Sequence, residues 1–158
     1  MPYHDGSAQG LAFSTKKLTP SIRIILKTLE AELGLKYQRS PVLTDLAYQG
    51  VLLLNCALSV KRGSPGSHMK LWEPFTDAVL AALKSKQHLV WMLWGNFAKK
   101  FIPLIPSNHL VLETVHPAST VYSGANEFNP RFTEVNKYLI EHAKKPIDWY
   151  PTEDDLPF

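Results

Sequence analysis

Leu89-Val90-Trp91-Met92-Leu93-Trp94, followed at once by Gly95-Asn96, is the stretch that decides the fold. Its first six residues are apolar and show no polar alternation, which is typical of a strand buried on both faces. Two further apolar runs, at residues 51–54 and 110–112, have the same character. We therefore expect three buried strands, spread over most of the chain.

Helical periodicity surrounds these runs. It is found in four stretches, at residues 19–34, 72–84, 96–101 and 131–143. Thr19 can cap the first helix, Pro20 suits its first position, and Gly34 can end it. Strands that alternate with helices predict an α/β fold with an open, mostly parallel sheet of three to four strands flanked by helices.

Length and composition restrict the class of protein. The 158 residues are 45% hydrophobic, which suffices for one folded domain over residues 1–158 that ends in an acidic tail at 150–158. The single cysteine, Cys56, excludes a disulfide framework and a Cys-rich zinc site. No apolar run approaches the ~18 residues of a membrane span, and we expect no secretory signal, because the first six residues have neither a basic region nor an apolar stretch. We therefore expect a cytoplasmic protein in a bacterium or virus, or a nuclear one in a eukaryote.

The residues that follow the three apolar runs are the candidate site. Asn55 follows the first run, Gly95 and Asn96 follow the second, and a loop, His116-Pro117-Ala118-Ser119, comes shortly after the third. Ligands of open α/β sheets bind beyond the carboxyl ends of the strands, so these residues are expected to share one rim. The alternative is that they merely turn the chain.

Signals for metal binding, cofactor binding and nucleophilic catalysis are weak or absent in the sequence. The six histidines lack metal-ligand spacing, and no phosphate loop, dinucleotide fingerprint or nucleophile elbow is present, so we expect no metal and no cofactor. The net charge of +3 fits a polyanionic partner but is shared by many soluble proteins. Lys61-Arg62 and Lys99-Lys100 are interpreted as solvated surface, with phosphate contact as the alternative.

Five segments now stand out by their order along the chain. They are Pro2-Tyr3-His4 with residues 10–14, residues 50–55, residues 93–98, residues 116–119 and residues 144–149. Together they resemble the motifs of family 1 uracil-DNA glycosylases over nearly the whole chain. The resemblance implies a monomeric enzyme that flips deoxyuridine out of DNA and hydrolyses its N-glycosidic bond in base-excision repair. Uracil-containing DNA is then the partner, and neither metal nor cofactor takes part.

The resemblance also implies a uracil pocket. Phe13 would stack on the flipped base, and the amide of Asn55 would match O4 and N3–H of uracil but not cytosine. Tyr3 would fill the space beside C5 and exclude the methyl group of thymine. His116, when neutral, would donate a hydrogen bond to uracil O2 as negative charge develops there.

Contact with DNA is implied at six positions. They are Ser21, Gly95, Asn96, Ser119, Thr120 and Val121. Hydroxyl and backbone N–H groups of Ser21, Gly95 and Ser119 would hold phosphates. Thr120 or Val121 lies in the wedge region, where a side chain fills the space that the flipped base leaves.

The amino-terminus departs from the family pattern. The family carries a Gln-Asp pair, preceded by a buried strand, just before its Pro-Tyr, and the Asp activates the attacking water. Met1 stands in the place of that Asp, and only His4 and Asp5 are nearby substitutes. We therefore expect weakened catalysis and a sheet without its first strand, as in a truncated gene product or one whose start lies upstream.

Two other functions compete with this interpretation. One is a non-catalytic protein that binds DNA or uracil through Phe13, Asn55 and His116, which the absent Asp favours. Retention of His116 argues against it, because binding alone needs no electrophile. The other is an unrelated α/β protein that binds a small molecule, which leaves the five ordered segments unexplained.

Overall fold

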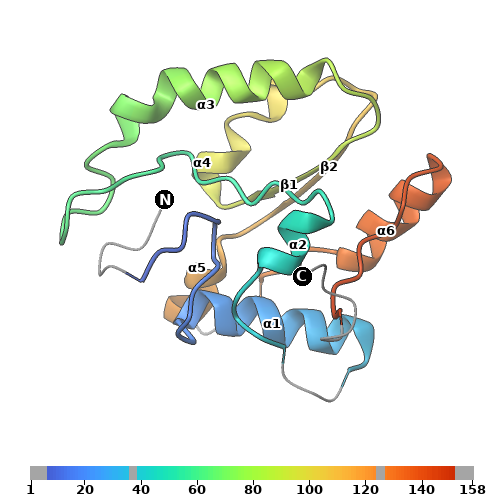
Figure 1. Ribbon diagram of the computed structural model, residues 1–158, viewed down its shortest axis with the longest axis horizontal. Helices are drawn as coiled ribbons and strands as arrows, with labels where there is room; N and C mark the ends of the chain where they lie inside the picture. The colour runs from blue at the N-terminus through green and yellow to red at the C-terminus, as the bar shows by residue number, and fades with distance from the viewer. Residues whose placement is uncertain (1–6, 36–38, 124–126, 152–158) are drawn as a thin grey trace. The chain divides into compact units, whose positions relative to one another are not determined.

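The computed structural model describes residues 7–35, 39–123 and 127–151. The described residues form α1 (Pro20–Leu33), α2 (Thr44–Tyr48), α3 (Met69–Lys84), β1 (Val90–Trp94), α4 (Asn96–Lys99), the 3-10 helix η1 (Ile102–Leu104), β2 (Leu110–Thr114), α5 (Pro117–Ser123) and α6 (Phe132–Glu141). Figure 1 shows these elements along the chain. None of the helices in the described ranges is long and apolar enough to cross a membrane.

The chain divides into two compact units. Unit 1 consists of Met1–Thr19, Arg39–Ala82 and Asp148–Phe158, and unit 2 consists of Pro20–Gln38 and Leu83–Ile147. Each unit is therefore built from segments that are distant in the sequence. The two strands and the helices α1, α4, α5 and α6 all belong to unit 2.

The sheet of unit 2 consists of β1 and β2, which run parallel and side by side (Figure 1). Their register pairs Val90 with Leu110 at one end and Trp94 with Thr114 at the other. The α/β class with an open parallel sheet is thus confirmed. Along β1, buried residues alternate with half-buried ones, so that one face of the strand is covered more completely than the other. The prediction that this strand is buried on both faces is therefore too strong.

Residues 51–54 differ from the prediction, because they form no strand. A strand needs a ladder partner, and the only ladder in the described residues joins β1 to β2. Leu54 N instead donates to Leu52 O at 3.0 Å, a local turn, and Leu53 O accepts from Ala12 N at 2.9 Å. The described sheet has two strands where three to four were expected.

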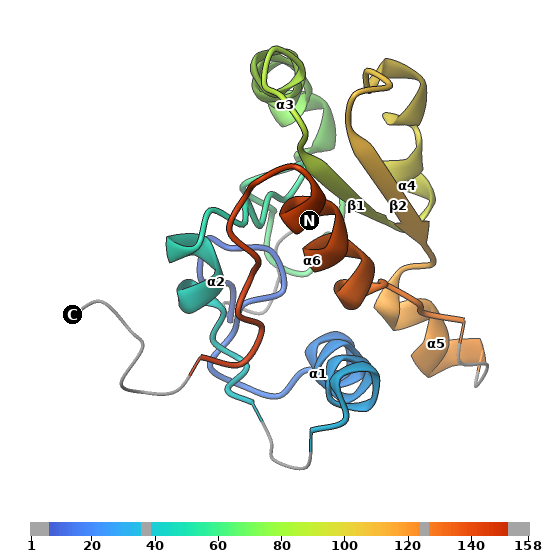
Figure 2. The same ribbon diagram turned by 90° about the vertical axis from the view of Figure 1, so that its right-hand side faces the viewer.

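The α1 helix follows the sequence prediction. Its apolar stripe buries Ile22, Ile25, Leu26 and Leu29. At its end Gly34 has a φ of +67°, and Leu35 N donates to Glu30 O at 2.9 Å, a 6→1 bond that caps the helix. Figure 2 looks along α1 and shows it beside α6 within unit 2.

A carboxylate at the end of α1 ties it to α6. Glu32 accepts hydrogen bonds from Phe132 N at 3.1 Å and from Thr133 N at 2.7 Å. These N–H groups belong to the first turn of α6, where no backbone acceptor exists within the helix. The α6 helix, whose presence was predicted, therefore receives its cap from another helix.

The helices around the sheet ends differ from the prediction in detail. Of the stretch predicted as a helix at 96–101, α4 covers only Asn96–Lys99, and η1 begins beyond the predicted end, at Ile102. The segment His116-Pro117-Ala118-Ser119, expected as a loop, is a loop only at His116, because Pro117 begins α5. Proline favours a first helical position, since its φ is already helical and its missing N–H has no partner there.

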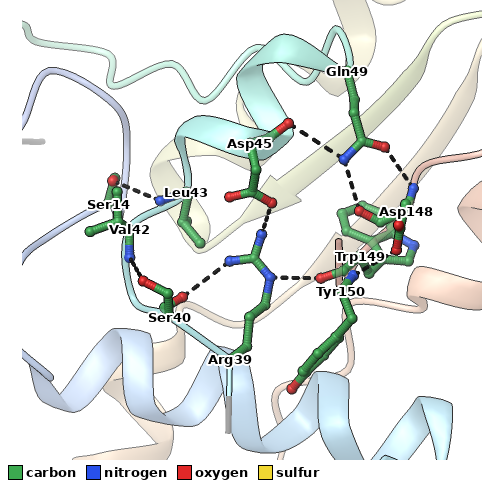
Figure 3. Close-up of polar contacts among 10 residues, drawn as sticks. All are labelled: Ser14, Arg39, Ser40, Val42, Leu43, Asp45, Gln49, Asp148, Trp149 and Tyr150. Atoms are coloured by element: carbon green, nitrogen blue, oxygen red, sulfur yellow. Dashed lines mark hydrogen bonds and ion pairs between the residues drawn. The ribbon is translucent and has the colours of Figure 1, made fainter. Parts of the chain in front are cut away.

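The carboxyl-terminal residues of the described chain are held in unit 1 by a polar network (Figure 3). Arg39 is buried, donates from Nε to Trp149 O at 2.6 Å, and forms an ion pair with Asp45. Gln49 Nε2 donates to Asp148 O at 2.8 Å, and Asp148 N donates back to Gln49 Oε1 at 2.7 Å. These bonds dock the segment against α2, a helix that the sequence patterns do not reveal.

Replacing Arg39 by methionine tests this network. The exposed fractions of the Arg39 and Asp45 side chains are 6% and 11%, so the substitution leaves a buried carboxylate without its cation. We expect the free energy of unfolding to fall by about 3–5 kcal/mol in urea denaturation. Lys137→Met, which breaks an exposed pair with Glu141, is the control and is expected to cost about 1 kcal/mol or less. Equal effects of the two substitutions would contradict the structural role of Arg39.

Candidate functional site

The two strands of unit 2 end together, and this places Gly95 against His116. Gly95 N donates to Thr114 O at 2.9 Å, which extends the ladder by one bond beyond Trp94. A Cβ atom on Gly95 would lie 3.0 Å from His116 Cβ, and Gly95 has a φ of +92°. Only glycine fits this position without strain. The expectation that residues following β1 and β2 share a rim is confirmed for this pair.

Thr114 fixes the end of β2 on its other side. Its buried hydroxyl accepts from Asn129 N at 2.9 Å and donates to Glu127 O at 3.3 Å. The segment before α6 is thereby attached to the last residue of the strand. Thr114, from which the chain continues to His116, is thus held by Gly95 through its carbonyl oxygen and by the segment before α6 through its hydroxyl.

His116 caps α5 with its ring. Ala118 N donates to Nδ1 of His116 at 3.1 Å, and Ser119 N donates to the His116 carbonyl oxygen at 2.8 Å. Nδ1 can accept this bond only when it carries no proton, so a neutral ring has its proton on Nε2. Burial of the half-buried ring lowers the pKa of His116 below the ordinary value of 6.5. The site therefore holds a neutral imidazole whose Nε2–H is a hydrogen-bond donor.

The α5 helix exposes its middle and end. Ser119 is exposed, the hydroxyl of Thr120 is buried, and Val121 is 44% exposed. Tyr122, which sequence reasoning did not single out, is 89% exposed. The signal that could have revealed it is Pro117, because a helix beginning there turns these side chains to different sides.

The remaining predicted residues of unit 2 are Ser21 and Asn96. Ser21 is half-buried in the first turn of α1, the helix that packs against α5. Asn96 is exposed and begins α4, directly after Gly95. Unit 2 therefore contains Gly95, Asn96, His116 and the α5 residues around one end of the sheet.

In unit 1, Phe13 has an unusual backbone. Its φ is +65°, a left-handed conformation that a phenylalanine adopts at a cost. Its neighbours are buried, with Ala12 at 5% and Ser14 at 1% exposure, whereas Phe13 itself is half-buried. Ser14 Oγ accepts from Leu43 N at 3.0 Å, and Thr15 N donates to Pro41 O at 3.2 Å. The surrounding chain therefore holds the backbone that carries the partly accessible Phe13 side chain.

One hydrogen bond joins the segment of Phe13 to that of Asn55. Ala12 N donates to Leu53 O at 2.9 Å, one residue before Phe13 and two residues before Asn55. Asn55 is half-buried. Unit 1 thus brings these two predicted pocket residues onto adjoining segments. Tyr3 and His4 lie outside the described residues.

The described residues offer no metal centre. No three of their histidine, cysteine, aspartate or glutamate side chains are grouped in a way that could hold a metal ion. Cys56 is a half-buried thiol whose pKa is raised by burial, which disfavours the reactive thiolate. The groups available for chemistry are therefore the imidazole, the amide, the hydroxyls and the aromatic ring.

Comparison with known proteins gives one consistent result. A family model described as the uracil DNA glycosylase superfamily matches residues 1–140. The uracil-DNA glycosylase of Amoebophilus asiaticus strain 5a2 is 45% identical over 155 residues, covering 94% of this chain and 70% of the relative. That of Campylobacter concisus strain 13826 is also 45% identical over 155 residues, covering 94% of this chain and 67% of the relative.

Solved structures agree on the fold. The mimivirus uracil-DNA glycosylase is similar with a TM-score of 0.77 and 24% identity, covering 92% of this chain and 61% of that one. A single-residue variant of the mimivirus protein in complex with UGI gives a TM-score of 0.80, again at 24% identity over 92% of this chain. The chain spans 62% of the length of that mimivirus protein.

The close approach of Gly95 to His116 can be tested by Gly95→Ala. The added methyl group would lie 3.0 Å from His116 Cβ, in addition to the strain of a positive φ. Gly34→Ala is the matched control, because Gly34 has a φ of +67° and nothing within 4 Å of the same methyl position. We expect Gly34→Ala to cost about 1 kcal/mol of unfolding free energy and Gly95→Ala about 2–3 kcal/mol. Urea denaturation measures both, and equal costs would argue against the tight contact.

Proposed function

The chain belongs to the uracil DNA glycosylase superfamily, and from this premise we propose that it releases uracil from DNA. The proposed reaction is hydrolysis of the N-glycosidic bond of a deoxyuridine that has been flipped out of the helix, as the first step of base-excision repair. In this reaction the sugar becomes cation-like and uracil leaves as an anion. Catalysis therefore requires a group directed at the developing negative charge.

The observation that carries this proposal is the state of His116. Its Nδ1 accepts a hydrogen bond from Ala118 N at 3.1 Å, so its Nε2 bears the proton and can donate to uracil O2. A neutral donor needs no counter-ion in a site that excludes water, and it strengthens its bond as charge builds on the oxygen. The contact of Gly95 with His116 supports the position of the ring.

Recognition of uracil is assigned to unit 1. Phe13, fixed in a left-handed conformation, would stack on the base, and the Asn55 amide would pair with O4 and N3–H. Tyr3 would exclude thymine by filling the space beside C5. Cytosine presents its donor and acceptor in the reverse order, so it would leave the polar groups of the Asn55 amide buried and unpaired. This cost discriminates strongly against cytosine.

Binding of the DNA backbone is assigned to unit 2. The exposed Asn96 and Ser119 are suited to phosphate contact, with Ser21 as a further contributor, whereas Gly95 is buried and its N–H already donates to Thr114 O. Of the two wedge candidates, we favour Val121, because its side chain is exposed whereas the hydroxyl of Thr120 is buried. A monomer would suffice for these contacts, and we place the protein in the compartment that contains DNA.

We further propose that hydrolysis by these 158 residues is slow. Met1 directly precedes Pro2-Tyr3, where the family resemblance expects a water-activating aspartate. Lack of a positioned base costs ~10²–10⁴ in rate. His4 is the nearest substitute. Adding Gln-Asp before Pro2 and comparing single-turnover rates tests this, and equal rates with and without the addition would show that another group activates the water.

The central experiment measures uracil release from an oligonucleotide that contains one deoxyuridine, using the wild-type chain, His116→Leu and His116→Asn. Asparagine is a good helix cap and can replace the ring's bond to Ala118 N, so His116→Asn keeps α5 but lacks the imidazole. We expect both variants to lose about 10²–10³ in the rate of release while DNA affinity changes only a few-fold.

Each outcome of this experiment decides something. If the wild-type chain and the chain with the added Gln-Asp both bind the oligonucleotide but release no uracil, the protein is a non-catalytic reader and the glycosylase proposal fails. If His116→Asn retains the wild-type rate, His116 is a helix cap without a chemical role. If His116→Leu fails to fold but His116→Asn folds, the rate of His116→Asn is the test.

The pH dependence of release follows from the neutral state of His116. Its pKa lies below 6.5 in the folded protein, so the ring stays neutral as pH falls through 6.5 and becomes charged only below its lowered pKa. We expect the acid limb of the rate profile to have its midpoint below 6.5. As pH decreases, the unfolded chain protonates His116 at a higher pH than the folded chain does. The free energy of unfolding should therefore fall as pH decreases from about 6.5 through the lowered pKa. His116→Asn should lack this contribution, and a rate midpoint above 6.5 would contradict a neutral His116.

A further inference from the structure

The segment that follows Gly95 carries an exposed aromatic and apolar surface. Phe97 in α4 is 46% exposed and Leu104 in η1 is 51% exposed. The ring of Phe101 packs edge-on against Phe97, with centroids 6.1 Å apart. Phe101 itself is half-buried, so Phe97 and Leu104 are the exposed apolar side chains of this short segment, and exposed apolar surface beside a functional site marks a place where a ligand can bind.

A cation accompanies the ring. Lys100 Nζ lies over Phe97, 5.3 Å from its centroid. The neighbouring Lys99 is different, because its Nζ lies 3.3 Å from Glu113 Oε2, which balances its charge. Within the described residues, Lys100 has no carboxylate at ion-pair distance. The surface therefore combines an aromatic face with an uncompensated positive charge.

This surface lies next to the proposed site. Phe97 is two residues from Gly95, where an added Cβ atom would lie 3.0 Å from His116 Cβ. One turn of helix advances only 5.4 Å. A nucleotide adjacent to a base held at His116 would therefore pass close to Phe97 and Lys100.

We propose that Phe97 and Lys100 form a stacking subsite for an unpaired nucleotide that flanks the flipped deoxyuridine. Lys100, which lies over the Phe97 ring, turns to the phosphate of this nucleotide, and the base takes its place on the ring. This subsite rests on the proposed function. Aromatic faces beside lysines bind single-stranded nucleic acid without sequence preference, because every base has a π-face. In a duplex the faces of a flanking base are covered by its neighbours, so the subsite acts on single strands. An apolar protein partner would leave the charge of Lys100 without a role.

The first experiment uses undamaged single-stranded oligonucleotides, so that it does not depend on uracil release. Fluorescence anisotropy compares the wild-type chain with Phe97→Ala, Phe97→Leu and Phe97→Tyr. We expect Phe97→Ala and Phe97→Leu to weaken binding about tenfold, since loss of one stacked base has that effect, and Phe97→Tyr to retain it. Ile140→Ala, which removes an exposed apolar side chain of α6, is the control and should leave binding unchanged.

The charge and the stacking are tested separately. Lys100→Gln should reduce the slope of log affinity against log salt concentration by about 0.7, the value for one phosphate on a single strand. A 2-aminopurine placed beside a deoxyuridine in a single strand should lose fluorescence on binding to the wild-type chain and not to Phe97→Leu.

Three results would overturn the proposal. The first is full binding by Phe97→Leu, which would indicate an apolar contact only. The second is an equal loss of affinity for single strands and for duplex when Phe97 is replaced. The third is a 2-aminopurine signal that does not depend on Phe97. If the wild-type chain binds with the expected pattern but releases no uracil, the proposed function fails while the subsite stands. If the chain releases uracil but substitution of Phe97 does not change single-strand binding, the subsite fails while the proposed function stands.

Discussion

The end of β2 at Thr114 is the constraint on which the rest of unit 2 depends. Its carbonyl oxygen accepts from Gly95 N at 2.9 Å, and its hydroxyl binds Asn129 N at 2.9 Å. Because the strands are parallel and in register, the chain leaves both of them at the same level. Gly95 and His116 are adjacent for this reason, and α4 and α5 begin on either side of that contact.

A single hydrogen bond then links fold to chemistry. The N–H group of Ala118 has no acceptor inside α5, and the ring of His116 supplies one. The same bond that stabilises the helix start keeps Nδ1 unprotonated and leaves the proton on Nε2. The proposed electrophile is therefore prepared by backbone geometry.

In unit 1 the candidate stacking residue, Phe13, is held in a strained backbone conformation. Phe13 keeps a φ of +65° because its buried neighbours are both held: Ala12 N donates to Leu53 O, and Ser14 Oγ accepts from Leu43 N in the segment around Leu43. That segment also carries Arg39 and Asp45, whose ion pair and bond to Trp149 O dock the end of the described chain. The position of the aromatic ring thus depends on contacts made far away in the sequence.

The sequence by itself determined the elements whose signals are local. The apolar stripe and end signals of α1, the apolar runs of β1 and β2 and the periodicity of α6 each describe a single segment, and all four are present in the structure. The order of five short segments was enough to indicate the family. Residues 51–54 were as apolar as the other runs, yet they form no strand, because a strand exists only where another strand pairs with it.

Only the tertiary structure decided the relations between segments. It placed Gly95 against His116, gave α6 its cap from Glu32, and buried Arg39 beneath Trp149. It also showed that Pro117 begins a helix, which exposes Val121 and Tyr122 and buries the hydroxyl of Thr120. These features depend on distances between residues that are remote in the chain, and periodicity within one segment carries no information about such distances.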